Sequence, residues 1–294
     1  MIKTAVIPSA GFGTRMLPAT KALPKEMLPV AGKQLIQYAI EEAAASGIKH
    51  VILVVRNRKS LVRSHFDPDL ALEAFLKERH LIAAAADIRH LTEMVDLEYV
   101  EQPRPLGLAH ALCCARCLVG DEPFAVLLPD VIMVNDEPVT LQLIRTHRDC
   151  GGSIVAIREV EPQDVEHHGI LRVECPAGAA SGSTLHVAGL VEKPTLPSAP
   201  SRLGIFGRYI LEFSVWDAIE RTSPDASGEI QLTDALNLLC QRSPLRGLFF
   251  VGQHFDAGDQ LGYLKANIEL SLKNPQLRQS CVEYLASLQR AFDC

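Results

Sequence analysis

The chain has 294 residues, of which 48% are hydrophobic and 22% charged, and this balance excludes a disordered or low-complexity protein. Its 35 acidic residues outnumber its 29 basic ones for a net charge of −6, which argues against a nucleic-acid binder because such a protein needs a basic surface. No apolar run reaches the roughly 20 residues that cross a bilayer, and the first segment, broken at Pro8, is too short for a secretory signal. We therefore expect a cytoplasmic protein that binds neither nucleic acid nor a membrane.

Short runs of β-branched residues predict buried strands, and longer segments with helical spacing predict helices between them. The predicted strands are Thr4–Ile7, His50–Val55, Leu97–Val100, Phe124–Leu128, Ser153–Val160, Leu185–Val191 and Leu248–Val251. The predicted helices are Gln34–Ser46, Pro68–Glu93 (as one helix or two), Ala109–Val119, Pro138–Asp149, Ser214–Arg221, Ile230–Arg242, Gln260–Leu272 and Leu277–Phe292.

The order of these elements predicts an α/β fold. Strands and helices alternate through the first 150 residues, which indicates a mostly parallel sheet with helices on both faces. Between residues 153 and 210 strands follow one another, with turn residues such as Pro176–Ser183, and this indicates an antiparallel addition to the sheet. No linker or charge run divides the chain, so we expect a single domain over 1–294 with C-terminal helices at about 260–292. The apolar character of those helices predicts a homodimer or homotetramer.

The eight cysteines are scattered along the chain, and without an export signal they predict reduced thiols rather than a disulfide framework. One cluster, Cys113, Cys114 and Cys117, contains a CxxC pair that could hold zinc. A structural zinc site needs about four ligands, and no second pair follows at a suitable spacing. Because the cluster also lies in the apolar stretch Ala109–Val119, we favour a packed helix.

A glycine- and proline-rich loop follows the first predicted strand. Gly11 and Gly13 allow the backbone to approach a ligand and point N–H groups at it. Arg15, Lys21 and Lys25 add three cations, a combination that suits a polyphosphate. The dinucleotide-binding and P-loop patterns are both absent. The alternative is a solvated surface loop, which the interleaved prolines disfavour because they fix the loop in one shape.

The loop from Gly11 to Pro29, GFGTRMLPATKALPKEMLP, resembles the signature of the sugar-1-phosphate nucleotidylyltransferases. The resemblance spans nearly the whole chain and is closest to the bacterial members that make UDP-glucose. Further matching segments are Leu35–Tyr38, His65–Asp67, Gln102, Gly107–Ala111, Gly120–Val126, Leu128–Val131, Gly189–Pro194, Gly207–Leu211, Gly228–Ala235, Asp256–Asp259 and Leu261–Tyr263.

This resemblance implies a three-layer, Rossmann-like nucleotidyltransferase fold with a mixed, mostly parallel central sheet. It also implies an enzyme, with Mg²⁺-dependent uridylyl transfer from UTP to glucose 1-phosphate giving UDP-glucose and pyrophosphate. One alternative is a related transferase that uses dTTP or another sugar 1-phosphate. The other is a catalytically weak regulatory paralogue, which the intact cations of the loop make less favoured.

The resemblance assigns roles to individual residues. Arg15, Lys25 and Lys193 are the expected catalytic cations. Asp130 and Asp256 are the expected Mg²⁺ ligands, although the residues alone leave open a helix cap at Asp130 and a turn at Asp256. The expected nucleotide-binding residues are Ala10, Gly11, Gly13, Glu26, Gln102, Gly107 and Asp130, with Gln102 reading uracil. The expected sugar-phosphate-binding residues are Gly169, Glu192 and Lys193.

Three positions depart from the family pattern. Gln34 stands where the family has proline, Ala109 where it has glycine, and His168 where it has tyrosine. We expect the methyl group of Ala109 to lie beside the base site and His168 to change the wall by the sugar. These departures bear on specificity and leave the reaction class intact.

Overall fold

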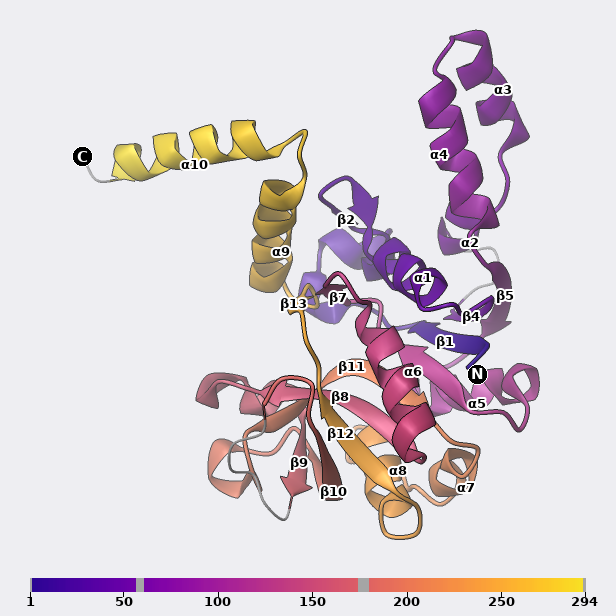
Figure 1. The fold of residues 1–294 in the computed structure, drawn as a ribbon, viewed down its shortest axis with the longest axis vertical. Coiled ribbons are helices and arrows are strands. Elements are labelled where there is room, and N and C mark those ends of the chain that lie inside the picture. The colour runs from indigo at the N-terminus through magenta and orange to yellow at the C-terminus, as the bar shows by residue number, and fades with distance from the viewer. Residues whose placement is uncertain (1, 57–60, 174–179, 293–294) are drawn as a thin grey trace.

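The computed structural model describes residues 2–56, 61–173 and 180–292. Its central sheet has nine strands in the order β5-β4-β1-β6-β11-β8-β12-β10-β9 (Figure 1). Their bounds are β1 Thr4–Ser9, β4 His50–Val55, β5 Asp96–Glu101, β6 Phe124–Leu127, β8 Ser153–Glu159, β9 Gly169–Val173, β10 Thr184–Glu192, β11 Leu203–Leu211 and β12 Leu245–Phe249. Strands β5, β4, β1 and β6 are mutually parallel, and β11, β10 and β9 add antiparallel pairings. The mixed sheet confirms the predicted fold class.

Helices cover both faces of the sheet. Their bounds are α1 Leu35–Ala45, α2 Leu61–Phe66, α3 Leu70–Glu78, α4 Ile82–Glu93, α5 Leu108–Val119, α6 Val139–Cys150, α7 Val215–Glu220, α8 Leu232–Leu239, α9 Gln260–Lys273 and α10 Arg278–Phe292. Among the described residues, no helix is long and apolar enough to cross a membrane.

Two hydrophobic cores lie on opposite faces because successive side chains of a strand point in opposite directions. On β1, Ala5 and Ile7 join the core formed with α1 and α6, whereas Val6 joins the core formed with α5, α7 and α8. The three-layer arrangement therefore follows from continuous apolar strands, which need cover on both sides. Trp216 stacks on Phe124 in the second core, with ring centroids 5.0 Å apart.

A third, smaller core packs the glycine-rich loop against the C-terminal part of the chain. It joins Met16 and Leu28 to Phe255 and to Leu270 of α9. Two short ribbons border this core: β2 Pro29–Val30 with β3 Lys33–Gln34, and β7 Val131–Val134 with β13 Gln253–Asp256.

Helix α9 is also hydrogen-bonded to the residues that follow the loop. The hydroxyl of Tyr263 donates to the carbonyl of Pro29 at 2.6 Å, and the backbone N–H of Ala31 donates to Oδ1 of Asn267 at 3.2 Å. The glycine-rich loop and α9 are thus held together by both apolar and polar contacts.

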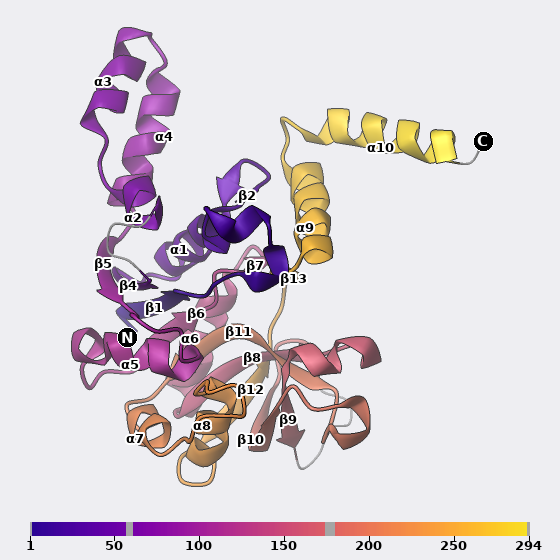
Figure 2. The ribbon, with the colours of Figure 1, turned by 180° about the vertical axis from the view of Figure 1, so that it is seen from behind.

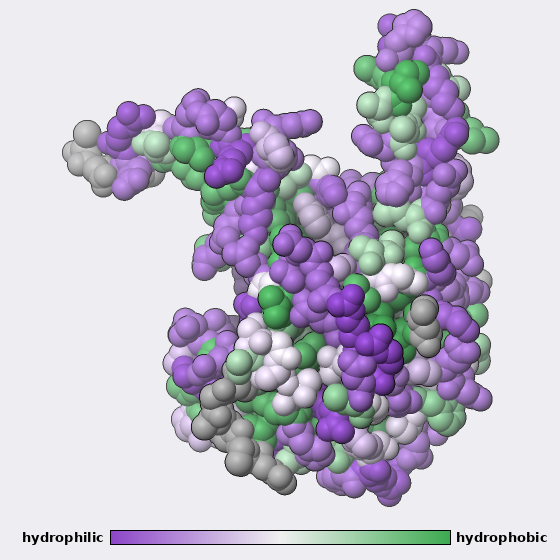
Figure 3. Space-filling model, in the orientation of Figure 1, coloured by the Kyte–Doolittle hydropathy of each residue, from purple (hydrophilic) through white to green (hydrophobic). Residues whose placement is uncertain are grey.

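Two projections extend from the body, the α3–α4 hairpin and the α9–α10 arm (Figures 1 and 2). Both carry exposed hydrophobic side chains, and green areas mark them on the surface (Figure 3). Examples are Leu70 and Ile82 on the hairpin, 74% and 61% exposed, and Val282 on α10, 48% exposed. Helix α10 buries none of its described side chains.

Most predicted helices agree with the structure, and the segment 68–93 forms two helices, α3 and α4. The cysteine cluster lies in α5, where Cys113 and Cys114 pack against the second core, so the packed helix is confirmed. Among the described residues, no group of three or more potential ligands is placed to hold a metal ion. Of the turn predicted at 176–183, residues 176–179 lie outside the described residues, as does Cys175.

Two strand predictions need correction. All nine residues of β11 are buried, yet Arg208 interrupts the apolar pattern and hid the strand. The strand predicted at Leu248–Val251 is β12, Leu245–Phe249. It continues through Gly247, where a Cβ would lie 2.6 Å from the Ile157 side chain, so glycine here permits close packing within the sheet.

A buried ion pair between Glu42 on α1 and Arg208 on β11 joins the layers. Nε and Nη2 of Arg208 donate to Oε2 of Glu42 at 3.0 and 2.7 Å. The Glu42 side chain is 7% exposed and the Arg208 side chain is 1% exposed. The other carboxylate oxygen of Glu42 accepts from the backbone N–H and the hydroxyl of Thr140, at the start of α6. A single carboxylate therefore connects two helices to the central strand.

The same guanidinium holds the turn between β6 and β7. Nη1 of Arg208 donates to the carbonyl of Leu128, and Nη2 donates to the carbonyl of Val131, each at 2.9 Å. These carbonyls lie on either side of Asp130. The position of that carboxylate is therefore set from inside the core.

We predict that Arg208→Met lowers the free energy of unfolding by about 3–5 kcal/mol, because it leaves the Glu42 carboxylate buried without its cation. The double variant Arg208→Met/Glu42→Leu should recover part of this loss. Urea denaturation measures both, with Arg221→Met, which breaks an exposed pair with Asp217, as a control that should change little. A single variant as stable as the wild type would contradict the prediction.

Candidate active site

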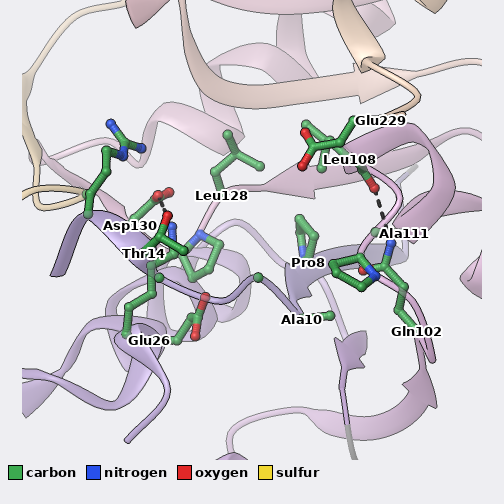
Figure 4. Close-up of a pocket in the computed structure, with 18 residues that line it drawn as sticks. Pro8, Ala10, Thr14, Glu26, Gln102, Leu108, Ala111, Leu128, Asp130 and Glu229 are labelled. Atoms are coloured by element: carbon green, nitrogen blue, oxygen red, sulfur yellow. Dashed lines mark hydrogen bonds and ion pairs between the residues drawn. The ribbon is translucent and has the colours of Figure 1, made fainter. Parts of the chain in front are cut away.

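A cavity of about 350 Å³ opens at the carboxyl ends of β1, β5 and β6. Ligands of open α/β sheets bind at this edge. The predicted nucleotide- and phosphate-binding residues line it together: Ala10, Gly11, Gly13, Arg15, Lys25, Glu26, Gln102, Gly107 and Asp130. Asp130, Thr14 and Glu26 lie at one end of the cavity, and Gln102 and Ala111 lie at the other (Figure 4).

The glycine-rich loop is held in one conformation. Gly13 has φ +62°, and a Cβ there would lie 3.1 Å from Cβ of Lys25, so the site requires glycine. The hydroxyl of Thr20 donates to the Gly13 carbonyl at 2.8 Å. The guanidinium of Arg56 donates to the carbonyls of Ala10 and Gly11. The loop therefore needs no ligand to set its shape.

Lys25 and Asp130 form an ion pair at the charged end, with Nζ 2.5 Å from Oδ2. Burial alone would lower the pKa of Lys25, but the charges of Asp130 and Glu26 outweigh it and raise that pKa. Burial would likewise raise the pKa of Asp130, and the Lys25 ammonium instead holds it below its usual value. Both groups are thus charged near neutral pH.

Glu26 lies beside this pair and is only 1% exposed. Its Oε2 atom has no hydrogen-bond partner among the described residues. Burial raises the pKa of Glu26 to about 7, against which the Lys25 ammonium acts only partly. The carboxyl is therefore half protonated near neutral pH.

A second cavity of about 250 Å³ adjoins the first and shares Arg15 and Asp130 with it. The remaining predicted site residues line it: Gly169, Glu192, Lys193 and Asp256. The structure thus brings all of the predicted site residues into two adjoining cavities.

Pairing of β9 with β10 places Gly169 opposite Glu192. A Cβ on Gly169 would lie 2.7 Å from the Thr233 hydroxyl and 3.4 Å from a Glu192 carboxylate oxygen, so glycine keeps this wall open. Lys193 has φ +43°, an uncommon conformation for a residue with a Cβ, and its N–H donates to the His168 carbonyl at 3.1 Å. Its Nζ lies 3.0 Å from Oε1 of Glu192.

The β7–β13 ribbon explains how two carboxylates that are distant in sequence meet. Val131 pairs with Asp256, and the Ala257 N–H donates to the Asp130 carbonyl at 2.8 Å. A Cβ on Gly258 would lie 2.9 Å from Asp256 Oδ1 and 3.4 Å from Asp130 Oδ2. Burial and the charge of Asp130 raise the pKa of Asp256. These oxygens therefore converge on one small space.

The structure also decides between the alternatives that the sequence left open at Asp130 and Asp256. Asp130 precedes a strand, so it does not cap a helix. Asp256 does stabilise a turn, because its Oδ1 accepts from the Gly258 N–H at 2.7 Å.

Two expectations about the cavity walls are wrong. Lys21 lines a separate cavity of about 300 Å³ together with Phe12, rather than the cavity that Arg15 and Lys25 line. The methyl group of Ala109 is fully buried in the second core and does not line the base end. His168, in contrast, lines the second cavity, and burial lowers its pKa.

Sequence reasoning assigned no role to several residues at the site. Arg56 is the first residue after β4, and polar residues that follow buried strands are a usable signal for this edge. Glu229 lines both cavities, on a loop that Asp225 shapes by accepting from the Glu229 N–H at 3.1 Å. His110 contacts Gln102 from α5. Both of these last two lie in segments that match the family pattern, Gly228–Ala235 and Gly107–Ala111, and that match is the signal that could have found them.

The arrangement can hold two anionic ligands side by side. Arg15 lines both cavities, Lys25 lines the first and Lys193 lines the second, so cations would meet phosphates from both sides. No hydroxyl or thiol nucleophile paired with a base is found among the described lining residues. The geometry therefore suits direct transfer of a group between two bound phosphates.

Comparisons with known proteins agree with this geometry. A family model described as nucleotidyl transferase matches residues 4–272. The chain is 40% identical over 284 residues to UTP–glucose-1-phosphate uridylyltransferase YngB of Bacillus subtilis, covering 97% of this chain and 94% of that protein. It is also 40% identical to UTP–glucose-1-phosphate uridylyltransferase 2 of Staphylococcus saprophyticus, covering 98% of each.

Solved structures give the same result. The UTP-bound UGPase from Acinetobacter baumannii superposes with a TM-score of 0.90 at 36% identity, covering 98% of this chain and 100% of that one. A UDP-glucose pyrophosphorylase complexed with UDP-glucose has a TM-score of 0.83 at 36% identity, covering 93% and 100%. The resemblance read from the motifs is confirmed.

The burial of Glu26 predicts a pH-dependent stability. The pKa of Glu26 rises from 4.5 to about 7 on folding. Below pH 4.5 the carboxyl is neutral in both states and does not lower the free energy of unfolding, whereas above pH 7 the buried charge lowers it in full. The difference corresponds to about 3 kcal/mol. Glu26→Gln should therefore be more stable than the wild type at pH 8, with a smaller gap at pH 5.

Urea denaturation at the two pH values measures this gap. Glu78→Gln, at an exposed position on α3, is the matched control and should show the same stability difference at both. A gap for Glu26→Gln that does not change with pH would contradict the burial argument.

Proposed function

The chain belongs to the nucleotidyl transferase family, and on that premise we propose that it transfers a uridylyl group from UTP to glucose 1-phosphate, releasing pyrophosphate. The observation that carries the proposal is the pair of adjoining cavities that share Arg15 and Asp130. The names of its relatives, which are 40% identical over almost the whole chain, give the substrates.

In the proposed reaction a phosphate oxygen of glucose 1-phosphate attacks the α-phosphorus of UTP. The bond from that phosphorus to the bridging oxygen breaks, and pyrophosphate leaves with the electron pair. The attacking oxygen is already ionised near neutral pH, so no general base is required. The difficulty is electrostatic, because one anion must approach another, and fixed cations reduce it.

Arg15 and Lys25 are proposed to bind the triphosphate at the charged end of the first cavity. Lys25 is paired with Asp130 in the free protein, so the phosphates would compete with that carboxylate for its ammonium. Lys193, at the edge of the second cavity, is proposed to hold the sugar phosphate beside the α-phosphate.

The other end of the first cavity is proposed to bind uracil and ribose. Gln102 can offer an amide to the base edge. Ala10, Gly11, Gly13 and Gly107 bring backbone close to the nucleotide, and Glu26 lies next to the phosphates. In the second cavity, Glu192 and the backbone at Gly169 are proposed to contact sugar hydroxyls.

We propose Mg²⁺ as the cofactor, held by Asp130 and Asp256. The donor set fits, because Mg²⁺ prefers oxygen ligands and is commonly bound by one or two carboxylates together with substrate phosphates. Their oxygens converge beside Gly258, and Arg15 lies next to them. When bound, the ion would neutralise charge on the triphosphate.

We also propose that the chain assembles as a homodimer or homotetramer. The support is the exposed apolar side chains of α9 and α10, such as Leu261, Leu264 and Val282, which are 60%, 55% and 48% exposed. Sedimentation of the purified chain tests this, and a monomer at all concentrations would contradict it.

The function is tested by measuring pyrophosphate release across a matrix of nucleoside triphosphates and sugar 1-phosphates. UTP with glucose 1-phosphate should give the highest kcat/KM. dTTP should follow closely, because thymine has the same polar edge as uracil. The two bases differ by one methyl group, and a pocket contact of about that size is worth about 1–3 kcal/mol. A preference for dTTP or another sugar would support the related transferase, and no turnover would support the regulatory paralogue.

We predict that Arg15→Ala and Lys193→Ala each reduce kcat by ~100–1000-fold, because each removes a fixed charge beside the reacting phosphates. Lys21→Ala is the matched control, since this cation of the same loop lines the separate cavity. Circular dichroism checks that the variants fold. Near-normal turnover in either folded variant would remove that residue from the mechanism.

We predict that Asp130→Asn and Asp256→Asn raise the Mg²⁺ concentration needed for half-maximal rate, because an amide oxygen lacks the charge that attracts the ion. Asp259→Asn is the control: Asp259 caps α9 by accepting from the Gly262 N–H at 2.8 Å, and asparagine caps a helix equally well. Initial rates at varied Mg²⁺ measure the effect. Full wild-type activity in a chelator would contradict the metal mechanism.

A further inference from the structure

The amide of Gln102 is held at the end of the first cavity away from Asp130 and Glu26 (Figure 4). The residue is 4% exposed and follows β5 directly. Its Nε2 lies 3.2 Å from the carbonyl oxygen of Gly107 and 2.9 Å from Nδ1 of His110 on α5. Two groups from the next helix and its preceding loop therefore meet the same amide nitrogen.

These contacts determine which way the amide faces. A backbone carbonyl can only accept, so the amide atom nearest the Gly107 oxygen must be the nitrogen. The second amide hydrogen then points at Nδ1 of His110, which must carry a lone pair. The imidazole is accordingly neutral with its proton on Nε2. Burial and the positive charge of Arg104 lower the pKa of His110, in agreement with this state.

The Gly107 carbonyl cannot turn away to relax the arrangement. Gly107 has φ +94°, and a Cβ there would lie 2.5 Å from the Ile230 carbonyl oxygen, so the two backbones are in close contact. The Gly107 carbonyl oxygen also accepts from the Ala111 N–H at 3.2 Å. The acceptor is thus fixed in place, and with it one of the two hydrogens of Gln102.

The other polar atom of the Gln102 side-chain amide is its oxygen. Within the described part of the chain it accepts no hydrogen bond, while both amide hydrogens are engaged. Gln102 lines the cavity, so its one unused polar atom is an acceptor. A base that meets it must supply an N–H group.

We propose that His110 is a positioning residue that fixes the Gln102 amide with its oxygen available to the nucleotide, and so selects a base with an N–H donor at the N3 position. The inference rests on the proposed function and extends it. Uracil carries N3–H, whereas N3 of cytosine carries a lone pair that would face the amide oxygen without a hydrogen. Thymine has the same N3–H, so His110 separates UTP from CTP but not from dTTP.

The test compares His110→Leu, which removes the acceptor at similar volume, with His110→Asn, whose side-chain oxygen can replace Nδ1. The leucine variant should lose about tenfold in the UTP/CTP ratio, the worth of one hydrogen bond. The asparagine variant should stay within about twofold of the wild type. The ratio is measured as kcat/KM and, without sugar phosphate, as Kd by titration calorimetry.

Two further variants separate positioning from general damage. His147→Leu on α6 removes a histidine whose Nδ1 contacts the Gly152 carbonyl, away from both cavities, and should leave the ratio unchanged. In a Gln102→Ala background, His110→Leu should change the ratio no further, because the amide that it positions is gone. If the leucine variant does not fold, His110→Met takes its place.

The proposal is overturned if His110→Leu weakens UTP and CTP equally, or if it still changes the ratio in the Gln102→Ala background. Failure of the proposed function has a different signature. In that case the wild type would not turn over UTP with glucose 1-phosphate, while the two nucleotide Kd values would still report on His110.

Discussion

The buried pair of Glu42 and Arg208 is the constraint on which the site depends. A charge inside a core is tolerated only when every polar atom has a partner, and these two side chains satisfy that condition across α1, α6, β11 and the β6–β7 turn. The arrangement has a functional consequence, because the carbonyls that complete the guanidinium shell flank Asp130. The element that supplies the carboxylate to the cavity is therefore part of the core.

Two cations of the site, Lys25 and Lys193, are paired with carboxylates of the same chain before any ligand arrives. Lys25 lies against Asp130, and Lys193 lies against Glu192. Each pair keeps a long side chain near its working position, which reduces the entropy lost when a phosphate binds. Arg56 and Thr20 do the same for the loop backbone. A site of this kind is ordered in advance, and an anionic ligand would replace the carboxylate partners of these two lysines.

The sequence allowed prediction of most helices, the parallel half of the sheet and the site residues that lie in contiguous motifs. It could not show that Asp130 and Asp256 converge, because that depends on the short β7–β13 ribbon, whose strands have no strong pattern of their own. Strand β11 was hidden by Arg208, a charge that is satisfied only through contacts distant in sequence. Lys21 was misplaced because spacing along a loop does not reveal on which side of it a side chain lies.

The contacts of α9 with the N-terminal loop have a consequence for biosynthesis. The loop that begins at Gly11 is translated long before α9, yet part of its packing surface comes from Tyr263, Asn267 and Leu270 of that helix. A nascent chain can form β1 and its neighbours while still attached to the ribosome. It cannot complete the third core until α9 has left the exit tunnel. The glycine-rich loop thus reaches its final packing only after α9 has been made, so a chain that stops before α9 leaves this loop without the support of that helix.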